Sequence, residues 1–216
     1  MQPPRPPNMT HTNTEETRPM LHRRRFQLSL LAAGVLALAG CKDAPPPFKN
    51  LDITGSDYAR SFDLQAPDGR NRSLADFKGR LVMVFFGFTQ CPDVCPTALS
   101  RAVAVRQMLG ADAERLQVIF ITVDPERDTA ELLSQYMAAF DPSFLALRGD
   151  LVRTTEVARE FKVFFNKVPT GSSYTMDHTA LSYVFDTQGR LRLAVRHSQG
   201  AEDVAHDLKL LLHEST

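Results

Sequence analysis

The unbroken apolar run over residues 81–86 constrains the fold of this chain more than any other feature. A strand that lacks polar alternation is covered on both faces, as in the sheets of α/β proteins. Residues 116–123 predict a second buried strand, and between the two strands the apolar residues of segment 96–109 recur at helical spacing. A buried strand, a helix and a second buried strand therefore form the centre of the predicted fold.

The segments around this centre continue the alternation of strands and helices. A strand over residues 61–64 is followed by the turn Pro67-Asp68-Gly69. Three more segments show helical spacing: residues 129–140, 151–161 and 201–213. Residues 181–185 and 191–195 flank a turn and predict a hairpin. This order predicts an α/β, thioredoxin-like fold with a central mixed sheet flanked by helices.

Two cysteines follow the first apolar run, in Cys91-Pro92-Asp93-Val94-Cys95-Pro96. The end of a strand and the first turn of a helix favour thiolates, because the helix N-terminus offers unpaired N–H groups and partial positive charge. On one helix face, residues four apart have Cβ atoms roughly 5–6 Å apart, whereas a disulfide needs about 3.5–4.5 Å. Metal–sulfur bonds of roughly 2.3 Å span the gap with less strain. The spacing favours a metal site, and a redox disulfide between Cys91 and Cys95 needs some rearrangement.

A metal site on two thiolates needs a further donor, and four histidines follow the N-terminal region: His178, His197, His206 and His213. His206 and His213 fall on the polar C-terminal helix and His197 follows a strand, so we expect all three at the surface. His178 lies in segment 174–179, a predicted loop that enters the strand at residue 181. Loops at that end of a thioredoxin-like sheet approach the cysteine helix. The residues alone leave a ligand role and a structural role for His178 equally open.

Composition and charge narrow the class of protein. The chain has 216 residues, 43% of them hydrophobic, which is enough for one well-buried domain. Three cysteines do not make a disulfide framework. The formal net charge is zero; residues 1–40 hold five basic and two acidic residues, which leaves a net of −3 beyond them. We therefore expect no nucleic-acid partner.

The N-terminal region predicts export. Arg23-Arg24-Arg25 precede an apolar run that is too short to span a bilayer comfortably. Leu38-Ala39-Gly40-Cys41 resembles the bacterial lipobox, in which the cysteine is acylated and the peptide is cut before it. We expect a signal peptide over residues 1–40, a lipidated tether over residues 41–57 and a domain over residues 58–216 that faces the periplasm.

Two alternatives remain open for this region. The apolar run is also compatible with a membrane anchor followed by an unmodified Cys41. The arginines partly resemble a twin-arginine signal, with Gln27 in place of the usual leucine. Residues 1–19 are unlike a signal n-region, which makes Met20 a candidate start.

Four motifs lie in order along the domain: Phe86-Gly87-Phe88-Thr89, Cys91-Pro92-Asp93-Val94-Cys95-Pro96, Val123-Asp124-Pro125-Glu126-Arg127-Asp128-Thr129 and Asp177-His178-Thr179. Together they resemble the Sco/SenC family of copper-binding cytochrome c oxidase assembly proteins, over about residues 62–212. The resemblance implies a thioredoxin-like fold and a copper site on Cys91, Cys95 and His178. It also implies delivery of copper, or of reducing equivalents, to the CuA centre in subunit II of cytochrome c oxidase. An upstream periplasmic copper donor is a further expected partner.

The expected donors suit this cargo, since thiolates select Cu(I) and an imidazole also accommodates Cu(II). Zinc fits the same donors. The family's usual anchor is a transmembrane helix, whereas this chain carries the lipobox at Cys41.

Five charged residues near these motifs have two interpretations each. Asp177 either orients the second ring nitrogen of His178 or lies at the surface. Asp93 is either a turn residue or a recognition charge. Asp124, Arg127 and Asp128 either dock a partner or serve the loop, with Asp128 or Thr129 capping the following helix.

Two other functions compete with a copper metallochaperone, which would not itself be an enzyme. A thiol–disulfide reductase keeps recipient cysteines reduced and does not need His178; in this interpretation Val168-Pro169-Thr170 is a proline loop. A peroxidase-like or redox-sensing protein needs a group such as Thr89 to activate one cysteine.

Overall fold

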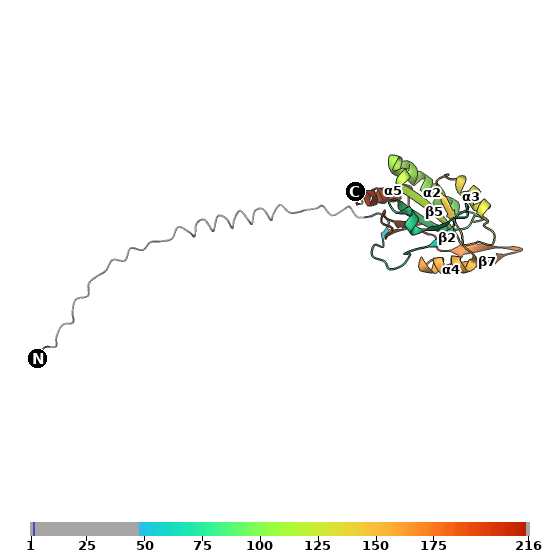
Figure 1. Ribbon diagram of the computed structural model, residues 1–216, viewed down its shortest axis with the longest axis horizontal. Coiled ribbons are helices and arrows are strands. Elements are labelled where there is room, and N and C mark those ends of the chain that lie inside the picture. The colour runs from blue at the N-terminus through green and yellow to red at the C-terminus, as the bar shows by residue number, and fades with distance from the viewer. Residues whose placement is uncertain (1, 3–47, 215–216) are drawn as a thin grey trace. The chain divides into compact units, whose positions relative to one another are not determined.

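The fold is built on a six-stranded mixed sheet in the order β1-β10-β9-β4-β5-β6 (Figure 1). The computed structural model describes residue 2 and residues 48–214. The strands are β1 (Leu51–Asp52), β4 (Leu81–Gly87), β5 (Leu116–Thr122), β6 (Leu145–Leu147), β9 (Leu181–Phe185) and β10 (Leu191–Arg196). Strand β5 runs parallel to β4 and β6, while β9 is antiparallel to β4 and β10.

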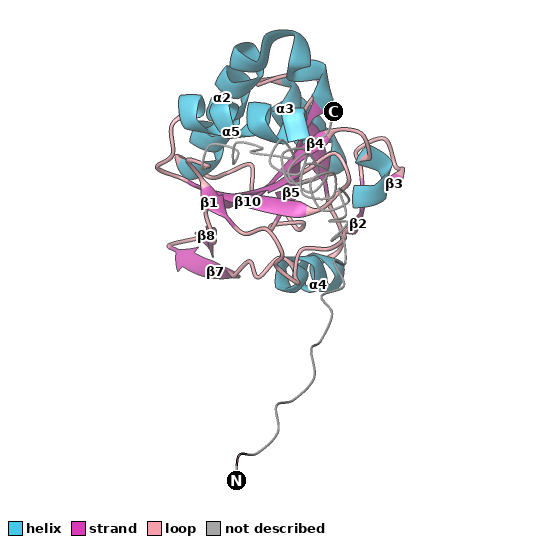
Figure 2. Ribbon diagram, turned by 90° about the vertical axis from the view of Figure 1, so that its left-hand side faces the viewer, coloured by secondary structure: helices cyan, strands magenta, loops and turns pink. Residues whose placement is uncertain are grey.

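Helices cover both faces of this sheet. They are α2 (Val94–Leu109), α3 (Ala130–Ala138), α4 (Leu151–Glu160) and α5 (Ala201–Glu214), with the short 3-10 helices η1 (Leu74–Phe77) and η2 (Gly110–Arg115). Figure 2 shows α2, α3 and α5 on one face and α4 on the other. Every residue of β4 and β5 is buried as a result. The predicted thioredoxin-like α/β fold is confirmed.

Helix α2 begins earlier than the sequence pattern predicts. It starts at Val94 and has Asp93 as its N-cap residue, so Pro96 is its third residue. Proline is tolerated there because the first four N–H groups of a helix have no partner within the helix. Cys95 therefore lies inside the first turn and Cys91 lies before the helix.

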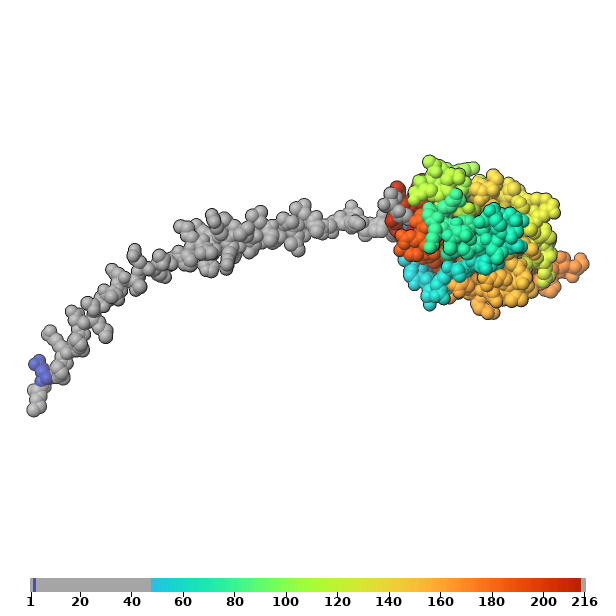
Figure 3. Space-filling model, viewed as in Figure 1, coloured from blue at the N-terminus to red at the C-terminus, as the bar shows by residue number. Residues whose placement is uncertain are grey.

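Two small ribbons complete the fold: β2 (Asp63–Gln65) with β3 (Asn71–Ser73), and β7 (Phe165–Thr170) with β8 (Ser173–His178). The second was not predicted, because segment 174–179 was expected to be a loop. Figures 1 and 3 show the tip of the β7–β8 hairpin projecting from the domain. Residues 168–170, considered above as a proline loop, are an exposed part of β7. The short polar strands lack the apolar runs that revealed β4 and β5.

Residues 48–57, expected in the tether, pack on the domain instead. Leu51 pairs with Ala194 of β10, and the Ile53 N–H donates to the carbonyl oxygen of Arg192. Asp207, fully buried on α5, accepts hydrogen bonds from the N–H groups of Lys49 and Asn50. The predicted domain boundary at residue 58 is therefore too late. A two-residue edge strand gives no periodicity, which is why the sequence did not reveal it.

The predicted signal peptide over residues 1–40 and the lipidation site Cys41 lie outside the described residues, apart from residue 2. Within the part of the chain that the structure describes, no helix combines the length and apolar character needed to cross a membrane.

Candidate metal centre

The two cysteines lie where β4 passes into α2. After β4, the Cys91 N–H donates to the carbonyl oxygen of Phe88 at 3.3 Å, which folds the loop back. Cys91 is half-buried, whereas Cys95 is fully buried. The Cys95 N–H lies 3.5 Å from Cys91 Sγ and donates to it. The thiols lie at the end of the strand and in the first turn of the helix, as expected. The Cβ spacing of two residues on one helix face does not apply to them, because Cys91 precedes the helix, but a first-turn N–H reaches its sulfur.

His178 ends β8 and points its ring toward the cysteines. The ring meets Phe85 and Phe88 edge-on, at centroid distances of 6.0 and 5.9 Å. Its Nδ1 donates to the carbonyl oxygen of Thr179 at 3.2 Å. A neutral imidazole that donates from Nδ1 keeps its Nε2 lone pair free. That Nε2 atom lies 3.8 Å from Cys95 Sγ.

The ring is oriented by a backbone carbonyl rather than by a carboxylate. Asp177 is exposed, on the opposite side of β8 from His178, since side chains alternate along a strand. The interpretation of Asp177 as the residue that orients His178 is therefore not the one that the hydrogen bonds support. Asp93 is exposed too, and its carboxylate accepts from the Thr97 hydroxyl at 3.3 Å.

Three ligand atoms converge at this point. The sulfurs of Cys91 and Cys95 and a ring nitrogen of His178 all lie within 4.8 Å of one another, the one group of this kind among the described residues. With bonds of about 2.3 Å to sulfur and about 2.0 Å to nitrogen, a 3.8 Å separation of Cys95 Sγ and His178 Nε2 gives a sulfur–metal–nitrogen angle of about 120°. Such an angle fits a three- or four-coordinate ion, so this sulfur and this nitrogen suit one metal.

The other three histidines among the described residues lie elsewhere. His213 is exposed on α5, and His206 contacts Asp207 through Nδ1 at 2.9 Å. His197 lies half-buried in the turn after β10.

The two thiols are electrostatically unequal. Hydrogen bonding from the Cys95 thiol, aided by His178 and by the N–H groups of Asp93 and Cys95, lowers the pKa of Cys91 to about 3 although burial opposes this. The neighbouring Cys91 thiolate, together with burial, raises the pKa of Cys95. At neutral pH the metal-free pair is therefore one thiolate and one thiol. A metal that binds both sulfurs displaces the remaining proton.

Asp128 fixes the loop that leads to the cysteines. Its fully buried carboxylate accepts from the hydroxyls of Thr89 and Thr122, each at 2.6 Å, and from the Thr89 N–H. Burial raises its pKa. The cap of α3 is Thr129, which accepts from the Leu132 N–H at 3.2 Å. Because the Thr89 hydroxyl donates to Asp128, its proton is not directed at a cysteine as the peroxidase interpretation requires.

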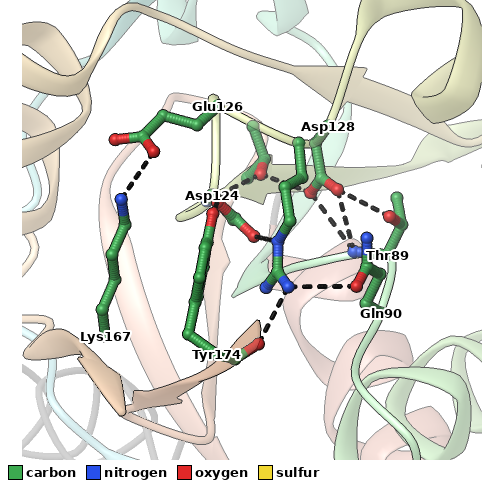
Figure 4. A network of polar contacts seen from close by, with 9 residues as sticks. Thr89, Gln90, Asp124, Glu126, Asp128, Lys167 and Tyr174 are labelled. Carbon is green, nitrogen blue, oxygen red and sulfur yellow. Dashed lines mark hydrogen bonds and ion pairs between the residues drawn. The ribbon is translucent and has the colours of Figure 1, made fainter. Parts of the chain in front are cut away.

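Asp124 and Arg127 join the loop after β5 to the β7–β8 hairpin. Figure 4 shows Asp124 beside Tyr174 of the hairpin. The buried Asp124 carboxylate pairs with Arg127 and accepts from the Tyr174 hydroxyl at 2.8 Å. Arg127 also donates to the Tyr174 carbonyl and to the Gln90 side chain. Sequence reasoning missed Tyr174 and Gln90. Residues 174, 176 and 178 are two apart and therefore share one face of a strand. This alternation is the sequence signal that would have identified Tyr174.

Known proteins resemble this chain in sequence and in structure. The model of the SCO1/SenC family matches residues 52–213. The chain is 36% identical over 132 residues to a SCO2-like protein of Rickettsia prowazekii, covering 60% of this chain and 64% of that one. It spans less than two thirds of the length of the first relatives it matches.

Two solved structures are similar to the domain. The structure of Bradyrhizobium japonicum ScoI with copper bound is 41% identical, with a TM-score of 0.64, and the match covers 69% of this chain and 96% of that one. The solution structure of apo Sco1 from Thermus thermophilus is 38% identical, with a TM-score of 0.69, and the match covers 76% and 97%.

Proposed function

The chain belongs to the SCO1/SenC family, and from this premise we propose that it is a copper metallochaperone for the CuA centre in subunit II of cytochrome c oxidase. Copper is held by Cys91, Cys95 and His178. The observation that carries the proposal is the convergence of two sulfurs and one imidazole nitrogen within 4.8 Å. The copper-bound state of the similar Bradyrhizobium japonicum ScoI supports it.

The donor set suits a cargo that must be released. Thiolates favour Cu(I) and the imidazole extends the range to Cu(II), so either oxidation state fits the same residues. Three protein ligands leave a position open for a ligand from the recipient, which permits transfer by ligand exchange. Cys91 is half-buried and therefore the sulfur that an incoming protein reaches first. Asp93 and Asp177, both exposed near the ligands, are recognition charges in this proposal.

Copper titration of the reduced full chain under anaerobic conditions tests the proposal. Wild type should bind one equivalent, and His178→Ala should lower the affinity for Cu(II) by more than the about 10–100-fold that loss of an outer partner costs. His213→Ala, which removes an exposed histidine of α5, is the matched control and should bind as wild type does. Unchanged Cu(II) affinity and absorption in His178→Ala would refute the three-ligand site. Competition with zinc in the same titration tests the choice of metal.

A thiol–disulfide reductase is the second candidate, favoured by the inequality of the two thiols. The Cys91 thiolate would attack one sulfur of a partner disulfide and release the other as a thiolate, which takes up a proton. Cys95, after losing its proton, would then displace the partner from the mixed disulfide. The partner gains two electrons and Cys91–Cys95 becomes a disulfide. His178→Ala should leave this exchange intact while it weakens copper binding, so the two functions separate in one variant.

The proposal includes export and lipid attachment at Cys41, so that the domain faces the periplasm and meets a copper donor there. Its support is the lipobox and the short apolar run before it. Cys41→Ser should leave an uncleaved, unacylated precursor, detected as a change in intact mass. Normal cleavage and retained acyl mass in that variant would contradict attachment at this residue.

A further inference from the structure

His178 is carried by a ribbon that is not part of the main sheet. Strands β7 and β8 form a separate two-stranded sheet. Cys91 and Cys95, by contrast, follow the fully buried strand β4. An isolated hairpin is at best marginally stable in water. The position of the imidazole therefore depends on what fastens the ribbon to the domain.

The ribbon is fastened along one face of β8. Side chains of a strand alternate between its two faces, so Tyr174, Met176 and His178 share a face. Met176 is buried in the core, and His178 lies between phenylalanine rings. The Tyr174 hydroxyl donates to Asp124, as described above.

Arg127 is the side chain that completes this fastening. Its guanidinium lies over the Tyr174 ring, 3.7 Å from the centroid. Its Nη1 donates to the Tyr174 carbonyl at 2.8 Å and to Gln90 Oε1 at 3.0 Å, while its Nε donates to Asp124. One side chain thus joins the ribbon, the loop after β5 and the residue next to Cys91.

A second ion pair also joins the ribbon to the loop after β5, but it contributes less to holding the ribbon in place. Lys167 of β7 lies 2.6 Å from the Glu126 carboxylate. Both side chains are substantially exposed, and exposed pairs contribute little to stability. Arg127, by contrast, is 17% exposed and its partner Asp124 is 1% exposed. The fastening therefore depends on Arg127 more than on Lys167.

The site tolerates little movement of the ribbon. A sulfur and a nitrogen bound to one ion lie at most about 4.3 Å apart, the sum of the two bond lengths. The 3.8 Å between Cys95 Sγ and His178 Nε2 leaves about 0.5 Å of slack. Tyr174 is four residues from His178, about 13 Å along the strand. If the ribbon is released at Tyr174, a small tilt is enough to separate Cys95 Sγ and His178 Nε2 by more than one ion can bridge.

We propose that Arg127 is a positioning residue for the third copper ligand: by holding Tyr174 against Asp124 and Gln90, it keeps the His178 imidazole within bonding distance of an ion on Cys91 and Cys95. The inference rests on the proposed copper function. It assigns to Arg127 a role that acts through His178. Lysine does not replace it, because a planar guanidinium stacks on the ring and donates in two directions at once.

A double-mutant cycle tests the inference. The affinity of the full chain for Cu(II) is measured by competition with a chelator, for Arg127→Ala and Arg127→Lys, each with His178 present and with His178→Ala. With His178 present, both Arg127 variants should lose about 10–100-fold in affinity and show weaker nitrogen coupling in the electron paramagnetic resonance spectrum. With His178→Ala they should lose nothing further, since coupled residues are not additive.

Arg115→Ala removes an arginine from an exposed ion pair with Asp112 and serves as the matched control. It should bind copper as wild type does. If Arg127→Ala does not fold, Arg127→Lys completes the cycle, and Tyr174→Phe tests the same fastening by removing only the hydroxyl bond to Asp124.

Three possible results distinguish a failure of the inference about Arg127 from a failure of the proposed copper function. Equal losses in both His178 backgrounds mean general damage and overturn the inference. Unchanged affinity in the Arg127 variants, with a clear loss in His178→Ala, overturns the inference alone. Copper binding that does not depend on His178 in the wild-type background overturns the three-ligand function, and the inference with it.

Discussion

Gly87→Ala tests the packing around the metal centre at its tightest point. Gly87 is the last residue of β4. A methyl group there would lie 2.7 Å from Cys95 Sγ, 2.7 Å from Phe120 Cε2 and 3.0 Å from Phe85 Cε1. All three neighbours are themselves buried. The absent side chain is what allows the buried sulfur to pack against the strand.

The size of the effect follows from these distances. Non-bonded heavy atoms prefer about 3.5–4.0 Å, so Cys95 Sγ must move by about 1 Å. Overpacking of this kind costs about 1–3 kcal/mol, equivalent to roughly 2–12 °C in melting temperature for a domain of this size. A displacement of about 1 Å is larger than the about 0.5 Å by which the 3.8 Å separation of Cys95 Sγ and His178 Nε2 falls short of the about 4.3 Å that one ion bridges. We therefore expect copper affinity to fall by about 10–100-fold, comparable to loss of an outer partner.

The assay pairs thermal denaturation of the metal-free protein with anaerobic copper titration. Gly200→Ala is the matched control, because its added methyl group meets only the carboxylate end of the Glu202 side chain, at 3.1 Å. The control should bind copper as wild type does. Wild-type melting temperature together with wild-type copper affinity in Gly87→Ala would show that the close approach has no energetic consequence.

Three further predictions concern the thiols and the N-terminal segment. Alkylation of the reduced, metal-free protein by iodoacetamide should modify Cys91 rather than Cys95, with a rate at Cys91 that stays constant down to about pH 4 and falls below it, because its pKa is about 3; an inflection near pH 8 would contradict this. Cys95→Ala should move the inflection of Cys91 to higher pH, since it removes the main hydrogen-bond donor to the thiolate. Asp207→Ala should lower the free energy of unfolding at pH 7 by about 2–3 kcal/mol, because a charged acceptor of backbone and Asn50 hydrogen bonds is lost. Burial opposes ionisation of Asp207 but hydrogen bonds lower its pKa overall, so this stabilisation is present above its ordinary value of 3.8 and is lost as the pH falls through the lowered pKa; an equal difference between wild type and variant at pH 7 and pH 2 would refute it.

The central strands and helices could be predicted from the sequence because burial on both faces leaves a strong local signal. The runs at residues 81–86 and 116–123 became β4 and β5, whose every residue is buried. The helices at residues 129–140, 151–161 and 201–213 have the predicted positions to within two residues at each end. In each case one face or both faces of a long element meet the core.

Short elements at the edge were not predictable in the same way. Strand β1 has two residues, and both are exposed. Five of the six residues of β7 are exposed as well. Such strands form because backbone groups pair with a neighbour already in place, as Leu51 does with Ala194. Their side chains show no pattern from which that pairing could be predicted.

The candidate site also has a part that the local sequence predicts and a part that it does not. The cysteine pair and the strand before it are local in sequence, so their position at a strand end was predictable. The distance between residues 95 and 178 is not local. It depends on Arg127, which belongs to a segment between them and which sequence reasoning assigned to docking or loop rigidity. Its contacts with Tyr174 and Gln90 join three segments that are remote in the chain. The identity of the metal ligands can therefore be predicted from residue types. The separation of Cys95 Sγ and His178 Nε2, on which metal binding depends, is set by side chains that bind no metal.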